Sequence, residues 1–106
     1  MDSNKYRNAV KSVIEAYAKL RPSHGKINLD VIFDEKNDRY ALMQTGWDRG
    51  RRVRGNLIYI TIQDQKVHIE YDGIEHGVVD DLVKHGVSEQ DIVLSFLSEN
   101  SLPTVA

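Results

Sequence analysis

Four arginines lie within six residues of one another, next to the only tryptophan of the chain. Guanidinium groups form forked hydrogen bonds with phosphates and carboxylates, and arginine and tryptophan are both enriched among the residues that anchor protein interfaces. We therefore predict a surface that binds a partner protein or DNA. Its residues are Trp47, Asp48, Arg49, Arg51, Arg52 and Arg54.

Charge along the chain leaves a second interpretation of this cluster open. Residues 1–54 carry twelve Lys or Arg and seven Asp or Glu, a net charge of +5, whereas residues 55–106 carry two and nine, a net charge of −7. This asymmetry indicates two surfaces of opposite charge, or one half that folds back on the other. In the second case the arginines pair with acidic side chains inside the fold. The position of Trp47 at the end of a predicted strand favours burial in the core.

No group of residues has the spacing of a known catalytic or metal site. The four histidines are isolated, and Glu75-His76 lacks the second histidine of the HExxH zinc motif. The carboxylates of Asp72, Glu75 and Asp80 leave one weaker hypothesis, a small metal-dependent hydrolase. We expect no catalytic residues, no metal and no cofactor, and we predict that the chain is not an enzyme.

The arginine cluster falls between two segments of alternating apolar and polar residues, which predicts a β-hairpin. Asp48-Arg49-Gly50 supplies the connection, because aspartate and glycine tolerate the positive φ of tight hairpin turns. The same alternation predicts four strands, over residues 27–33, 39–47, 52–63 and 67–72. Short turns join them, so consecutive strands are expected to pair antiparallel as a meander.

Helical periodicity flanks the predicted sheet on both sides. An amphipathic helix is expected over residues 3–20, with apolar residues every three or four positions. Helical spacing returns after residue 75, and we expect two further helices, divided by Gly86 and by a capping sequence that begins at Ser88. The predicted fold is α+β: a four-stranded antiparallel meander with one N-terminal and two C-terminal helices (α-β-β-β-β-α-α). Helices are expected to cover one face and to leave the other half polar, with Asn28, Asp30, Thr61, His68 and Glu70 as its candidates.

Length and composition define the class of protein. A chain of 106 residues with 41% hydrophobic and 28% charged residues is typical of one globular domain, over residues 1–106. There is no cysteine and the net charge is −2, whereas proteins built only to grip DNA are usually basic. No apolar run has the length of a membrane span and no signal peptide is visible, so we expect a cytoplasmic protein. Apolar residues on both sides of the third strand lead us to expect a homodimer.

Several stretches of the chain together carry a family resemblance. They are Ile32-Phe33-Asp34-Glu35, Gly46-Trp47-Asp48, Arg52-Val53-Arg54-Gly55, Asp72-Gly73-Ile74-Glu75-His76-Gly77 and the run from Leu82 to Phe96. In this order they resemble the XisI family, the controlling factors for excision of the fdxN element in cyanobacteria. The resemblance implies a non-catalytic factor in site-specific DNA excision during heterocyst development. It also implies action alongside a site-specific recombinase and an XisH-like partner. Direct DNA binding by the Arg49–Arg54 cluster is the alternative.

Overall fold

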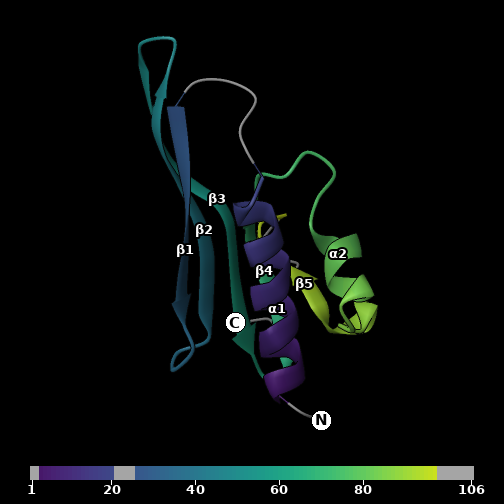
Figure 1. The fold of residues 1–106 in the computed structure, drawn as a ribbon. Helices are drawn as coiled ribbons and strands as arrows, with labels where there is room; N and C mark the ends of the chain where they lie inside the picture. Colours follow the sequence, from purple (N-terminus) through teal and green to yellow (C-terminus); the bar gives the residue numbers. More distant parts are fainter. Residues whose placement is uncertain (1–2, 21–25, 98–106) are drawn as a thin grey trace, which may run out of the picture.

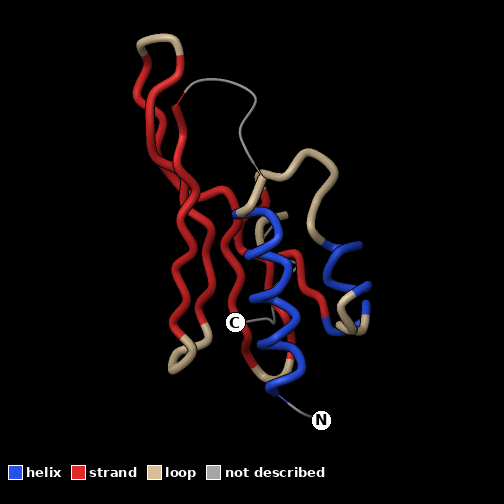
Figure 2. The backbone as a smooth tube through the Cα atoms, viewed as in Figure 1, coloured by secondary structure: helices blue, strands red, loops and turns tan. Residues whose placement is uncertain are grey.

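A computed structural model describes residues 3–20 and 26–97, in which one long helix lies across one face of a five-stranded sheet (Figure 1). Figure 2 shows the strands as one twisted layer beside the helices. The elements are α1 (Ser3–Ala18), β1 (Lys26–Asp34), β2 (Arg39–Asp48), β3 (Arg51–Gln63), β4 (Lys66–Asp72), α2 (Val79–Lys84), the 3-10 turn η1 (Glu89–Asp91) and β5 (Ile92–Leu94). No helix in these two ranges is long and apolar enough to cross a membrane.

The first four strands form the predicted antiparallel meander. They pair in sequence order, and each begins and ends within one residue of its predicted range. The turns after β2 and β3 contain two residues each, and all four have positive φ: Arg49 (53°), Gly50 (78°), Asp64 (52°) and Gln65 (62°). Positive φ at both central residues is the geometry of a type I′ turn, whose twist matches that of the strands it joins.

The end of the sheet and the C-terminal helices differ from the prediction. Only one of the two expected C-terminal helices forms, namely α2, and it ends before Gly86. The segment predicted as the last helix instead contains η1 and then β5, which pairs parallel to β4 with Ile92 opposite Val67 and Leu94 opposite Ile69. The sheet is therefore mixed and has five strands. The backbone of β4 would otherwise be an open edge, and a short strand rich in β-branched residues is well suited to cover it.

The hydrophobic core lies between α1 and the sheet. Of the stripe of α1 predicted from its periodicity, Tyr6, Val10, Val13 and Ile14 are buried and Tyr17 is partly buried; Ala9 is buried beside them. The sheet contributes Tyr40, Leu42, Ile58, Ile60, Val67 and Ile69, and the C-terminal segment adds Val78, Leu82 and Val87. Each large apolar side chain buried in this way contributes roughly 1.5–3 kcal/mol. This packing fixes the orientation of β2 and β3, which together form the hairpin described below.

Two of the polar residues expected on the outer face of the sheet are buried. Thr61 and His68 are 1% and 5% exposed, respectively. Thr61 Oγ1 donates a hydrogen bond to Glu70 (3.3 Å) and accepts one from Gln63 (3.0 Å). His68 Nδ1 lies 3.4 Å from Ser95 Oγ. These polar side chains can be buried because each has a hydrogen-bonding partner.

Candidate functional site

The predicted binding surface lies on a hairpin that projects from the body of the protein (Figure 1). β1 accompanies β2 only as far as Trp47, and β4 pairs with β3 only over residues 58–63. Within residues 3–20 and 26–97, the strand ends around the Arg49-Gly50 turn therefore have no third strand beside them. A shallow hollow of about 360 Å³ on this projection is lined by Asp48 and residues 51–54.

The hairpin register divides the cluster between two sides. Directly opposed residues of an antiparallel pair point to the same side of a sheet, and successive residues alternate. Trp47 lies opposite Arg52, and Thr45 lies opposite Arg54, so the tryptophan and these two arginines share one side. Asp48 lies opposite Arg51, and both point to the other side of the hairpin. That side is continuous with the face of the sheet on which α1 packs. The six predicted residues thus belong to one hairpin but not to one flat surface.

Trp47 is exposed, which contradicts the expectation that it is part of the core. Its side chain is 54% exposed, and the Arg52 guanidinium carbon lies 5.5 Å from the centre of its ring. A cation–π contact of this kind is worth roughly 0.5–1 kcal/mol at an exposed site. Arg52 Nη1 also donates a hydrogen bond to the carbonyl oxygen of Gly46 at 3.3 Å. These contacts hold the indole and the guanidinium group together on the outer side of the hairpin.

The four hairpin arginines are exposed, and none forms an ion pair with an acidic side chain in the described ranges. The ion pairs found there join Arg7 to Asp38 and Lys11 to Glu35. The acidic helix α2 lies on the other side of α1 from the hairpin (Figure 1). The interpretation in which the C-terminal half neutralises the cluster is therefore wrong for this part of the chain. Four arginines and Asp48 leave residues 47–54 with a net charge of +3.

Gly46 shapes the base of the hairpin. It is buried and lies opposite Ile27 of β1. A Cβ atom at this position would overlap the carbonyl oxygen of Lys26 and lie 2.8 Å from Ile27 Cα. Glycine therefore allows β1 to approach β2 closely where the hairpin leaves the sheet.

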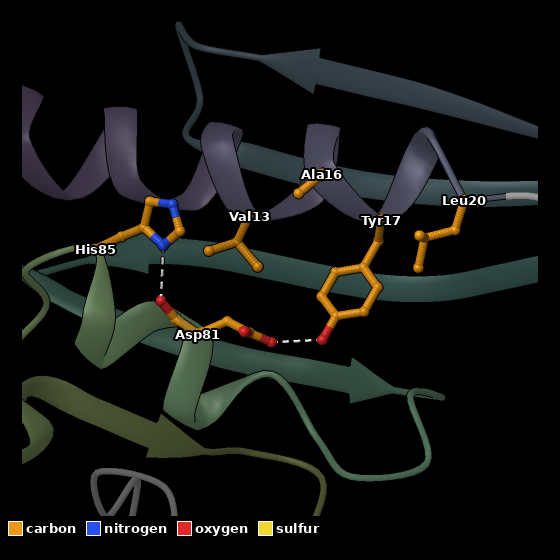
Figure 3. Close-up of a pocket in the computed structure, with 6 residues that line it drawn as sticks. All are labelled: Val13, Ala16, Tyr17, Leu20, Asp81 and His85. Atoms are coloured by element: carbon orange, nitrogen blue, oxygen red, sulfur yellow. Dashed lines mark hydrogen bonds between the residues drawn. The ribbon is translucent and has the colours of Figure 1, made fainter.

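A second hollow, of about 180 Å³, lies between α1 and α2 (Figure 3). The phenol of Tyr17 points across it and donates a hydrogen bond to the carboxylate of Asp81, while His76 Nε2 lies 2.9 Å from the same phenol oxygen. His85 Nδ1 lies 2.8 Å from the carbonyl oxygen of Asp81. Burial, and then the bond to Asp81, raises the pKa of Tyr17, so the phenol remains protonated at neutral pH. Sequence reasoning placed Tyr17 on the apolar stripe and missed this contact, which fastens α2 to α1.

The carboxylates considered for a hydrolase do not converge. Asp72 accepts hydrogen bonds from the backbone N–H groups of Ile74 (3.1 Å) and Val78 (2.9 Å), which shapes the connection from β4 to α2. Glu75 and Asp80 are exposed. In the part of the chain that the structure describes, no three His, Cys, Asp or Glu side chains lie close enough together to hold a metal ion.

This chain is similar to a known protein family and to solved structures. The family model described as XisI protein matches residues 1–104. The chain belongs to the XisI family. Two solved structures that this XisI chain resembles come from Anabaena variabilis. The fdxN element excision controlling factor XisI is 30% identical, with 96% of this chain and 100% of that chain covered and a TM-score of 0.78. An XisI-like protein is 25% identical, with 92% and 89% covered and a TM-score of 0.80. No curated protein matches the chain.

Proposed function

We propose that this XisI-family chain is a non-catalytic factor that controls site-specific excision of a DNA element, such as the fdxN element during heterocyst development. The observation that carries the proposal is the match to the excision controlling factor of Anabaena variabilis, which covers 96% of this chain. A role in binding rather than in chemistry agrees with the exposed, unneutralised arginines of the hairpin. The protein would act in the cytoplasm, where the chromosome lies.

The partner we propose is an XisH-like protein, with the recombinase and DNA as further members of the assembly. The contact surface is the projecting hairpin, Trp47 to Arg54. Arginine and tryptophan are the side chains most often found at the energetic centres of protein interfaces. A net charge of +3 on residues 47–54 favours a partner surface that is acidic.

Co-expression with the XisH-like protein of the same genome tests this proposal. Light scattering on the eluted material should give the mass of a mixed complex. The double variant Arg49→Ala/Arg51→Ala should weaken that complex at least about 10-fold, because hot-spot arginines cost about 2 kcal/mol or more when truncated. A matched control, Lys19→Ala/Lys84→Ala, removes the same charge from two exposed positions, one in the turn after α1 and one at the end of α2, and should leave affinity unchanged. Elution of the two proteins in separate peaks would contradict the proposal that the XisH-like protein is the partner. A complex whose affinity is unchanged by the hairpin variant would contradict the proposal that the hairpin is the contact surface.

Direct binding of DNA by the Arg49–Arg54 cluster is the second candidate function. It is favoured by one observation, the absence of acidic partners for these arginines in the described ranges. On duplex DNA, four phosphate contacts would give a slope of about −3.6 in a plot of log K against log salt concentration, since each contact contributes about −0.9. An affinity for DNA that barely changes between low and moderate salt would rule this candidate out.

A further inference from the structure

The outer face of the sheet, away from α1, carries a row of apolar and aromatic side chains. Ile32, Ala41, Tyr59 and Tyr71 lie directly opposite one another across β1, β2, β3 and β4. They alternate with residues such as Leu42, which is fully buried against α1, so they point to the outer side. Ile32 and Tyr71 are 55% and 46% exposed, respectively. Solvent therefore reaches both ends of this row, and Ala41 and Tyr59 between them are partly buried.

This row and the outer side of the hairpin form one continuous surface. Trp47 and Arg52 occupy the same side of the sheet, and Lys26 of β1 lies opposite Trp47. Along β3 the distance from Arg52 to Tyr59 is roughly 23 Å, at about 3.3 Å per residue. The outer surface thus has an aromatic ring at the hairpin, two tyrosines in the middle of the sheet, and its positive charges at the hairpin end.

We propose that this outer face binds single-stranded nucleic acid, with the base rings on Trp47 and Tyr71 and the phosphates on Lys26, Arg52 and Arg54. Unpaired bases stack on exposed aromatic rings, and lysine and arginine neutralise the backbone that connects them. In a duplex the bases are already stacked on one another and cannot use an aromatic platform of this kind. The inference rests on the second proposed function, nucleic-acid binding at the hairpin, and names the form of nucleic acid.

The charges on the outer face also indicate the course of the strand. Asp30 lies opposite Met43, so its carboxylate is on the outer side of β1, whereas Asp34 lies directly opposite Arg39, which offsets its charge. The Asp30 carboxylate repels phosphate from the β1 edge of the sheet. A bound strand would therefore run from the hairpin along β2 and β3 toward Tyr71 of β4. An acidic peptide would use the arginines equally well, but it would gain little from the aromatic row.

The single tryptophan makes the proposal directly measurable. A single-stranded oligothymidine of ten nucleotides should quench the fluorescence of Trp47 and bind more tightly than a duplex of the same length. Trp47→Leu and Tyr71→Leu should each weaken binding of the oligonucleotide about 10-fold, which lies within the effect of losing one stacked base. The fluorescence anisotropy of a labelled oligonucleotide measures this binding. Both side chains are substantially exposed, so neither variant is expected to unfold, and circular dichroism checks this.

A charge variant tests the phosphate contacts separately. Arg52→Gln/Arg54→Gln should reduce the slope of log K against log salt concentration by about 1.4, since each contact to a single strand contributes about 0.7. The control Lys19→Gln/Lys84→Gln makes the same change in net charge on the helix side and should leave the slope unchanged. If the protein bound the duplex as tightly as the single strand, and Trp47 fluorescence were not quenched, bases would not stack on the outer face. DNA binding by the hairpin arginines would still stand in that case. The inference would be overturned if polyglutamate bound as tightly as the oligothymidine, or if no oligonucleotide bound at all. Neither result would bear on the XisH-like partner, because that proposal is tested without nucleic acid.

Discussion

Alanine at position 46 should destabilise the junction between β1 and β2. The new Cβ atom would lie 2.8 Å from Ile27 Cα and would overlap the Lys26 carbonyl oxygen, whereas carbon atoms in contact are about 3.5–4.0 Å apart. β1 would therefore have to move by about 1 Å. Forced overpacking of this kind costs about 1–3 kcal/mol, and the positive φ of Gly46 adds about 1–2 kcal/mol for a residue with a side chain. We expect a loss of about 2–5 kcal/mol from a free energy of unfolding on the order of 5–15 kcal/mol.

Urea and thermal unfolding, followed by circular dichroism, measure this loss, and we expect the melting temperature to fall by at least about 10 °C. Gly55→Ala is the matched control. Gly55 also has a positive φ (134°), but no atom lies within 4 Å of the position its Cβ would occupy. It should therefore show only the backbone cost of about 1–2 kcal/mol. If both variants lost the same stability, the close approach of β1 would not be the reason for glycine at position 46.

Two further predictions concern the contacts of α1. Tyr17→Phe removes the hydrogen bond to Asp81 and should lower the free energy of unfolding, measured in urea, by about 1 kcal/mol. The loss is no larger because water can reach the half-buried Asp81 carboxylate once the phenol is gone. An unchanged free energy would mean that this contact does not stabilise α2. The hydrogen bonds from Arg7 and then from Tyr40 hold the pKa of Asp38 below its usual value, so its contribution is present at neutral pH and is lost as the pH falls below about 4 through the folded-state pKa. Asp38→Asn should therefore be less stable than the native chain at pH 7, by a difference that shrinks as the pH falls below about 4, and a stability difference independent of pH would contradict this assignment.

The alternation of side chains made the first four strands predictable. Tyr40 and Leu42 are fully buried, and Ala41 and Met43 between them are only partly buried, as period two requires. The same period places Trp47 with Ala41 and Met43 on the outer face. It also separates Arg51 from its neighbours on the hairpin. Treating the cluster as one surface, and Trp47 as core, ignored information that the sequence contains.

The C-terminal strand could not be obtained in the same way. Ile92, Val93, Phe96 and Leu97 have helical spacing, and Ser88 with Asp91 matches a capping sequence. In the structure Ser88 makes no side-chain capping hydrogen bond, and the helical turn ends at Asp91. A three-residue strand is too short to show a period, and its formation depends on the open edge of β4. Tertiary context therefore decided this segment against its local pattern.

The contact between Tyr6 and Asp91 has a consequence for the growing polypeptide. The Tyr6 phenol donates to the Asp91 carboxylate and accepts from the backbone N–H of Ser88, so the first turns of the chain meet residues made 82 to 85 positions later. At a synthesis rate of about 5–20 residues per second, roughly 5–15 s separate the two on the ribosome. Strands β1 to β4 are made before this contact can form, and the core residues of β2 to β4 pack with Val10 and Ile14 of α1. A ribosome stalled before residue 88 would therefore hold α1 on these strands without the two partners of Tyr6.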